Sequence, residues 1–183
     1  VQAGVITARI QEEARKRGLL YAGDPCSGDC CCIGGNGATN AGGNRAVKYG
    51  TTRDQIYAIE VVTPTGQIAH LGKRLHKMTA GYPLEKIVIG SEGTLGIITE
   101  LTLKLVLLPR ATAHVLAVFP SPETALALVT ALPKAGITPT CLEFMDYDVI
   151  SVVQDWFKEK QPCPAGGAYM IIQLDSSRDE TLD

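Results

Sequence analysis

Glycine is concentrated in two separated segments of this 183-residue chain, and these segments limit what it can fold into. Residues 33–43 read IGGNGATNAGG, and residues 90–96 read GSEGTLG. Because glycine has no Cβ, backbone N–H groups in such segments can approach a phosphate or a flat ring closely, and Asn and Thr add short hydrogen-bonding side chains. Taken alone, the first segment is better explained as a mobile surface loop. The second is explained equally well as a tight turn entering a sheet.

Neither glycine-rich segment carries the pattern of a common nucleotide site. The chain has no G-x-x-x-x-G-K-[ST] loop, and no G-x-G-x-x-G pattern follows a predicted strand. We therefore disfavour ATP-binding P-loops and NAD sites of the ordinary dinucleotide-binding type. The formal net charge of -2, and the lack of a basic stripe interleaved with aromatic residues, also argue against nucleic-acid binding.

The first half of the chain mixes one clear helix with irregular structure. Ile6, Ile10 and Ala14 recur at helical spacing, which predicts an amphipathic helix over residues 5–17. Residues 21–52 are so rich in turn-forming residues that we expect no regular structure there beyond a short helix.

Strand patterns follow this irregular stretch. Residues 56–63 and 67–71 are predicted to form a hairpin around Pro64-Thr65-Gly66, because Pro presets the turn and Gly closes it. Residues 84–89 are a short apolar run. Apolar residues at odd positions then predict a half-buried strand that ends at Pro109. These residues are Ile97, Leu101, Leu103, Leu105 and Leu107.

After residue 109 the pattern changes to strand, helix, strand, helix, strand. The strands are expected at residues 112–119, 140–145 and 169–174. Ser121 and Asp146 are predicted to cap the two helices. The second helix carries an apolar face of Val149, Ile150, Val153, Trp156 and Phe157. This order predicts a small α+β domain, ferredoxin-like in outline and incomplete.

The two ends of the chain indicate a piece of a longer protein. Residues 177–180 read as a capping box, which predicts a helix beyond the last residue. Residues 1–4 lead almost directly into a helix with no strand before it. We therefore expect truncation at both ends of a two-domain chain, with one domain at 1–109 and another at 110–183.

Four of the six cysteines, Cys26, Cys30, Cys31 and Cys32, crowd into one loop. Zinc sites usually take ligand pairs at C-x-x-C or H-x-x-x-H spacing, which the chain lacks, so we favour free thiols in a reducing cytoplasm. A cysteine-based metal or redox module remains an alternative. No apolar stretch reaches the roughly 18 to 20 residues of a membrane span, so we expect a soluble cytoplasmic protein.

Several motifs in the same order resemble FAD-linked oxidases of the vanillyl-alcohol-oxidase type. They are Asp24-Pro25, the IGGNxATNAGG run at 33–43, Lys48-Tyr49-Gly50, Gly81-Tyr82, and GSEGTLGIIT at 90–99. The likeness is strongest to the FAD-bearing subunit of glycolate oxidase and to D-lactate or D-2-hydroxyglutarate dehydrogenases. It is dense over residues 1–109, and Leu142–Asp146 resembles a segment of that family's cap domain.

This resemblance implies FAD as the cofactor and hydride transfer from the α-carbon of a 2-hydroxy acid to the flavin. It implies an α+β fold in which a partial FAD-binding lobe, with an antiparallel or mixed sheet and helices, precedes an incomplete ferredoxin-like cap domain. The implied contacts to the pyrophosphate and isoalloxazine are Asp24, Pro25, Ser27, Gly34, Gly35, Asn36, Thr39, Asn40, Gly42 and Gly43. Tyr49 and Gly50 are placed near the ring, and Glu92, Gly93, Thr94, Gly96, Ile97 and Ile98 on the ribose and adenine side. A helix beginning within 34–43 would direct its positive end towards the pyrophosphate.

The chain also departs from the family pattern. The family's other FAD-binding lobe and its His-rich substrate and metal segment are both missing, and Pro83 stands where relatives usually carry Asp. We therefore expect the chain alone to be inactive and to bind FAD weakly or not at all. We assign no residue a catalytic role, and the three histidines are expected to be solvated or core residues. No metal site is expected.

The expected partners are a small 2-hydroxy acid in the whole protein, the missing lobe and C-terminal segment, redox subunits, and further copies of the chain. The competing hypothesis is a non-enzymatic interaction domain whose glycine-rich segments serve only as turns.

Overall fold

The computed structural model describes residues 1–158 and 162–177. The chain divides into two compact units, Val1–Leu108 and Pro109–Asp183, which we call the first and second units. Each has its own hydrophobic core. The capping box predicted at 177–180 extends into residues that lie outside the described part of the chain.

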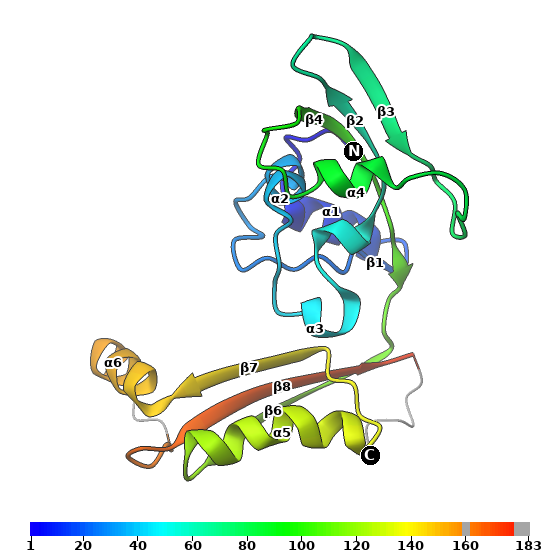
Figure 1. Ribbon diagram of the computed structural model, residues 1–183. Coiled ribbons are helices and arrows are strands. Elements are labelled where there is room, and N and C mark those ends of the chain that lie inside the picture. The colour runs from blue at the N-terminus through cyan, green and yellow to red at the C-terminus, as the bar shows by residue number, and fades with distance from the viewer. Residues whose placement is uncertain (159–161, 178–183) are drawn as a thin grey trace. The chain divides into compact units, whose positions relative to one another are not determined.

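The first unit is built on a three-stranded antiparallel sheet with the order β3-β2-β4 (Figure 1). Its strands are β2 (Ile56–Val62), β3 (Ile68–Gly72) and β4 (Ile97–Leu103). The predicted hairpin is confirmed as β2 and β3, with Gly66 at a φ of 81° in the turn. The first residues of the chain run beside β4, where Val1 N donates to the Leu101 carbonyl oxygen over 2.8 Å.

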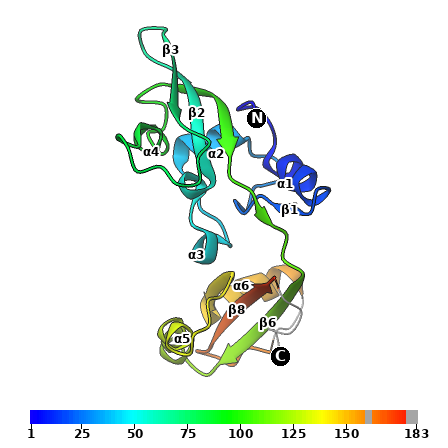
Figure 2. The ribbon, with the colours of Figure 1, turned by 90° about the vertical axis from the view of Figure 1, so that its right-hand side faces the viewer.

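Short helices and one two-stranded ribbon surround this sheet. They are α1 (Thr7–Arg15), β1 (Leu19–Leu20), α2 (Ile33–Thr39), α3 (Ala46–Tyr49), the 3-10 helix η1 (Thr52–Gln55), α4 (Leu84–Val88) and β5 (Val106–Leu107). The amphipathic helix predicted at 5–17 is confirmed as α1, and β1 pairs with β5. The apolar run at 84–89 forms a helix, α4. Figure 2 shows α1 and α4 on opposite sides of this unit, with β2 between them.

The core of the first unit forms where α1 and α2 meet the sheet. Ile10 from α1, Ile33 from α2 and Leu101 from β4 are all buried in it. Gly37 allows α2 to lie close to β4, because an added Cβ would lie 3.2 Å from Leu101 Cδ2. The first glycine-rich segment is therefore fixed against the sheet over its helical part.

The strand predicted to run to Pro109 is divided into β4 and β5, and Leu107 of β5 is 76% exposed. Within β4 the predicted inward side is wrong at Ile97, which is 66% exposed, whereas Ile98 and Leu101 are buried. The reason is a β-bulge, because Glu60 pairs with Glu100 while the next residue, Val61, pairs with Ile98. The extra residue switches the inward side from even to odd positions, which a strict alternation cannot anticipate.

The second unit is a three-stranded antiparallel sheet with helices. The strands β6 (Ala111–Phe119), β7 (Cys141–Asp146) and β8 (Ala168–Ser176) lie in the order β6-β8-β7. Helix α5 (Pro122–Lys134) connects β6 to β7 and packs along all three strands (Figure 1). Since β8 is inserted between the two strands that α5 connects, the arrangement is the split β-α-β unit of ferredoxin-like folds. The predicted α+β fold is confirmed.

Both predicted helix caps of the second unit are confirmed. The Ser121 side chain accepts a hydrogen bond from Thr124 N at the start of α5, and Asp146 Oδ1 accepts one from Val149 N over 3.0 Å at the start of α6 (Tyr147–Phe157). The apolar face predicted for α6 is largely uncovered, since Ile150 is buried while Trp156 is 82% exposed.

Candidate functional site

The two glycine-rich segments lie side by side in the first unit. Gly90 N donates to the Gly37 carbonyl oxygen over 3.0 Å, and Glu92 N donates to the Ala38 carbonyl oxygen over 2.8 Å. Both bonds run from backbone to backbone. The segments are therefore joined directly, although α3, η1, the β2–β3 hairpin and α4 separate them in the sequence.

A cavity of about 420 Å³ opens where these segments meet, and we call it the Gly35–Gly93 cavity. It is lined by Ala3, Gly4, Gly34, Gly35, Ala38, Glu92, Gly93, Gly96, Ile97 and Ile98. At Gly35 and Gly93 an added Cβ would meet nothing within 4 Å, so these two residues present bare backbone to open space. Position 34 requires glycine for a different reason, because an added Cβ would collide with Ala3 Cβ at 2.5 Å.

Glu92 is the one charged residue among those that line this cavity. Its φ of 52° lies in the left-handed region, which costs free energy for a residue with a Cβ. The side chain is exposed, and a carboxylate here can only accept hydrogen bonds while it is ionised. The position suits a ligand that offers hydroxyl groups rather than a second anion.

A second group of the predicted residues gathers around Asp24. The Asp24 carboxylate accepts a hydrogen bond from Gln11 Nε2 over 3.1 Å and lies 3.4 Å from Arg45 Nε. Gly43 packs directly on the backbone of Asp24 and has a φ of 152°, so a side chain there would collide with the Asp24 carbonyl oxygen. The end of the first glycine-rich segment is therefore held against Asp24-Pro25.

Arg45 belongs to this group, and the sequence reasoning missed it. Its side chain is 16% exposed, and its Nη1 is buried with no hydrogen-bond partner in the described part of the chain. Buried guanidinium N–H groups normally have acceptors, so this nitrogen suits an oxygen that comes from outside the chain. The signal in the sequence was a basic residue two positions after the glycine-rich segment.

Several of the predicted contacts use their side chains inside the protein. Asn36 is buried and donates to Thr7 Oγ1 over 2.7 Å. Thr39 Oγ1 donates to the Gly35 carbonyl oxygen over 3.0 Å, and Asn40 Oδ1 accepts from Arg53 N over 2.8 Å. Each of these three side chains therefore makes a hydrogen bond that stabilises the fold.

The remaining predicted residues lie away from the Gly35–Gly93 cavity or only near its edge. Ser27 is exposed, and its carbonyl oxygen accepts from the backbones of Cys30 and Cys31. The Tyr49 carbonyl oxygen accepts from Gln55 Nε2 over 2.5 Å. Thr94 Oγ1 donates to the Ser91 carbonyl oxygen over 2.6 Å. Pro25, Gly42 and Gly50 do not line the cavity either.

The start of α2 differs from the expected phosphate-binding helix end. The helix begins at Ile33, before the range 34–43. Ile33 N donates to the Val5 carbonyl oxygen over 2.9 Å, and Gly34 N donates to the Ala3 carbonyl oxygen over 2.8 Å. These first two N–H groups are used within the protein and are not available to a phosphate.

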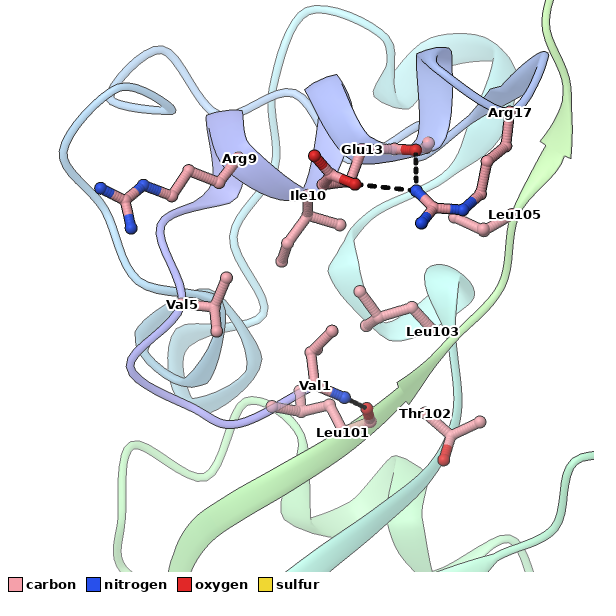
Figure 3. Close-up of a pocket in the computed structure, with 11 residues that line it drawn as sticks. Val1, Val5, Arg9, Ile10, Glu13, Arg17, Leu101, Thr102, Leu103 and Leu105 are labelled. Carbon is pink, nitrogen blue, oxygen red and sulfur yellow. Dashed lines mark hydrogen bonds and ion pairs between the residues drawn. The ribbon is translucent and has the colours of Figure 1, made fainter.

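A larger hollow of about 580 Å³ lies between α1 and β4 (Figure 3). Its lining includes the apolar side chains of Val1, Val5, Ile10, Leu101, Leu103 and Leu105. Glu13 and Arg17 join across one side of it at 2.8 Å. Since that pair is satisfied and the rest of the lining is largely apolar, this hollow suits packing rather than chemistry.

The described residues contain neither a metal-binding cluster nor a helix that could cross a membrane. Within 1–158 and 162–177, no group of three or more His, Cys, Asp or Glu side chains is placed to hold a metal ion. Over the same residues, no helix has both the length and the apolar character that crossing a membrane demands.

Two protein families match the chain. Residues 1–72 match the FAD binding domain, and residues 108–183 match the C-terminal domain of FAD linked oxidases. The first match contains the Ile33–Gly43 segment and Arg45. These matches confirm the resemblance noted in the sequence.

Curated relatives and solved structures are consistent with this assignment. The chain is 41% identical to D-lactate dehydrogenase of Anaerostipes hadrus over 189 residues, covering 100% of this chain and 39% of that protein. It is 40% identical to the glycolate oxidase subunit GlcD of Bacillus subtilis (strain 168) over 173 residues, covering 94% of this chain and 37% of that protein. A structure of alkyldihydroxyacetonephosphate synthase has a TM-score of 0.76 and 25% identity, covering 96% of this chain and 35% of that one. The chain thus spans less than two fifths of the length of these proteins.

Proposed function

We propose that the first unit of this chain, which matches the FAD binding domain, supplies one wall of an FAD site, formed by the Gly35–Gly93 cavity together with Arg45. The single observation that carries this proposal is the pair of backbone hydrogen bonds that joins the two glycine-rich segments. A ligand that contacts one segment is thereby within reach of the other.

The residues present fit such a cofactor in two respects. Bare backbone at Gly35 and Gly93 allows a flat ring or a sugar to approach without a Cβ in the way. The unpartnered Nη1 of Arg45 is a donor that suits a phosphate or carbonyl oxygen. The backbone at Gly35 and Gly93 thus offers a surface for close approach, and Arg45 offers the positive charge that binding of a pyrophosphate requires.

We assign different parts of the cofactor to the two groups of residues. Glu92 and the segment up to Ile98 face the ribose and adenine, because a carboxylate accepts hydrogen bonds from sugar hydroxyls but repels a phosphate. Asp24, Gly43 and Arg45 face the pyrophosphate and the ring. Asp24 acts by orienting the Arg45 guanidinium at 3.4 Å, rather than by touching a phosphate itself.

For the whole protein we propose oxidation of a small 2-hydroxy acid. The names of the relatives, D-lactate dehydrogenase and a glycolate oxidase subunit, support this substrate class. Bound FAD supplies the hydride acceptor, and the residues of this chain bind and orient it. In this proposal residues 1–109 form the partial FAD-binding domain, and residues 110–183 form the start of the cap domain.

We also propose a cytoplasmic location and self-association, with redox subunits as further partners. No disulfide joins cysteines within the described residues, which suits a reducing compartment. Exposed apolar side chains on α6, including Val152 at 69% and Trp156 at 82%, support association between copies. Sedimentation velocity tests this: Trp156→Lys should shift the chain towards the monomer, and an unchanged distribution would contradict it.

Titration of the purified chain with FAD, followed by flavin fluorescence, tests the cofactor site. We expect weak but saturable binding, since the cavity and Arg45 supply only part of a dinucleotide's contacts. Arg45→Met should weaken it by about tenfold or more, as expected for the loss of a charge-assisted hydrogen bond of about 1.5–3 kcal/mol. Arg15→Met is the matched control, because Arg15 is exposed on α1 and outside both groups of residues. Equal effects of the two substitutions would contradict the proposal.

A further inference from the structure

A separate cavity of about 290 Å³ lies beside α4 in the first unit, and we call it the Glu85 cavity. Its lining includes Tyr57 from β2, Lys73 and His76 from the segment after β3, Glu85 and Lys86 from α4, and Lys104. None of these residues lines the Gly35–Gly93 cavity. The Glu85 cavity therefore has a chemistry of its own, which the proposed FAD site does not use.

Glu85 is the unusual residue in this cavity. The residue is only 4% exposed, and its Oε2 has no hydrogen-bond partner among the described residues. A buried carboxylate oxygen without a donor is costly, so its presence indicates a donor from outside the described chain. Gly72 leaves room for this side chain, because a Cβ there would lie 3.1 Å from Glu85 Cγ.

Three lysines line the same cavity as Glu85. Lys86 Nζ donates to the carbonyl oxygens of Arg53 and Ile56, which fixes its position. Burial lowers the pKa of Lys86, while the charges of Asp54 and Glu85 act in the opposite direction. Lys73 and Lys104 contribute two more ammonium groups to the lining. Among the described residues that line the cavity, three are lysines and two, Asp54 and Glu85, carry carboxylates.

We propose that the Glu85 cavity binds a small carboxylate that carries a neighbouring hydroxyl or ammonium group. The ligand's carboxylate pairs with Lys73 and Lys104, and its hydroxyl or ammonium donates a hydrogen bond to Glu85. A simple carboxylate such as acetate satisfies the lysines but leaves Glu85 unpartnered. The cavity should therefore discriminate in favour of a ligand with a donor next to its carboxylate. The proposal does not depend on FAD.

Amide NMR titration of the chain without FAD tests this, with glycolate, glycine and acetate as probes. We expect saturable shifts in residues 72–86 and at Lys104, with acetate binding at least about fivefold more weakly than the better of the other two. Glycolate above glycine identifies a hydroxy acid as the ligand class, and the reverse identifies an amino acid. Shifts around residues 33–43 or 90–98 instead would place binding at the proposed cofactor site and would overturn the assignment to this cavity.

Two substitutions separate the roles of the lining residues. Glu85→Met removes the acceptor at similar volume, and it should abolish the preference over acetate without weakening acetate binding. Lys104→Met should weaken all three probes together, whereas Lys134→Met on α5 should weaken none. If Glu85→Met fails to fold, the proposal is still tested by the Lys104→Met variant and by the order of affinities of the three probes for the native chain. No saturable binding, or an acetate affinity equal to that of glycolate and glycine, would overturn the proposal.

Discussion

The backbone N–H of Glu92 donates to the carbonyl oxygen of Ala38 over 2.8 Å. This bond joins the turn before β4 to the last part of α2, and the neighbouring bond from Gly90 to Gly37 repeats the connection at 3.0 Å. Because both bonds use backbone atoms, most side-chain substitutions leave the connection intact. Variants in either segment can therefore report on ligand contacts without separating the two segments.

Glu92 should show opposite effects on stability and on binding. Its φ of 52° is strained, so Glu92→Gly should raise the free energy of unfolding by about 0.5–1 kcal/mol. The same substitution removes the carboxylate proposed to accept ribose hydroxyls, so FAD affinity should fall. Thermal unfolding and flavin fluorescence measure the two effects. Lys158→Gly is the matched control, because Lys158 has a φ of 56° in the second unit and should gain stability without any change in binding.

Gly43 and Gly42 should respond very differently to the same small change. Gly43→Ala forces a Cβ against the Asp24 carbonyl oxygen at a φ of 152°, and should cost about 1–3 kcal/mol of unfolding free energy. Gly42→Ala adds its Cβ in open space and should stay within about 0.5 kcal/mol. Urea unfolding measures both. Similar losses at the two positions would contradict the packing of this segment on Asp24.

The Glu13–Arg17 ion pair should make a pH-dependent contribution to the stability of α1. The hydrogen bond from Arg17, followed by that from Lys16, lowers the pKa of Glu13 from 4.5 to about 2. A lowered pKa stabilises the folded state above the unfolded-state value, and this stabilisation is lost as pH falls from 4.5 towards 2. Glu13→Gln should therefore lower the urea midpoint at pH 7 and have little effect near pH 2. Glu12→Gln keeps the Arg17 pair and should not reproduce this pH dependence.

Cys31 should be alkylated by iodoacetamide at lower pH than Cys30. Burial works to raise the pKa of Cys31, but hydrogen bonds from Thr7, Asn36 and Ser27 outweigh it and lower that pKa. The charge of Asp29 raises the pKa of Cys30. The thiolate is the reactive form, so mass spectrometry at pH 7 should find Cys31 modified first of the two. Thr7→Val should slow the alkylation of Cys31, and Thr7→Ser should restore the original rate. Faster labelling of Cys30 would contradict these pKa directions.

Local patterns in the sequence were enough to locate most helices and strands. Ser121 and Asp146 cap helices where predicted, because a cap depends on a few neighbouring residues. The side that β4 buries was predicted wrongly at Ile97, because the bulge depends on pairing with β2, far away in the sequence. The exposure of Trp156 on α6 could not be predicted for the same reason, since the residues that bury one face of a helix come from other parts of a fold.

The candidate site was only partly predictable. The glycine-rich segments were found because missing side chains are visible in the sequence, and the structure places Gly35 and Gly93 at one cavity. Asn36 was misleading, because a polar residue in a glycine-rich segment looks like a ligand contact until its bond to Thr7 is seen. Arg45 was missed because an unpartnered buried nitrogen is a property of packing, and composition does not reveal it.

Hydrogen–deuterium exchange of the chain with and without saturating FAD tests the cofactor wall most directly. We predict that amides in residues 33–43 and 90–98 gain protection together, and that Gly35→Leu, which fills the Gly35–Gly93 cavity, removes the protection of both. As the matched control, Ala127→Leu on the exposed surface of α5 should leave the protection unchanged. Protection of only one segment, or of neither while FAD is bound, would contradict the claim that the two segments form one wall of a flavin site.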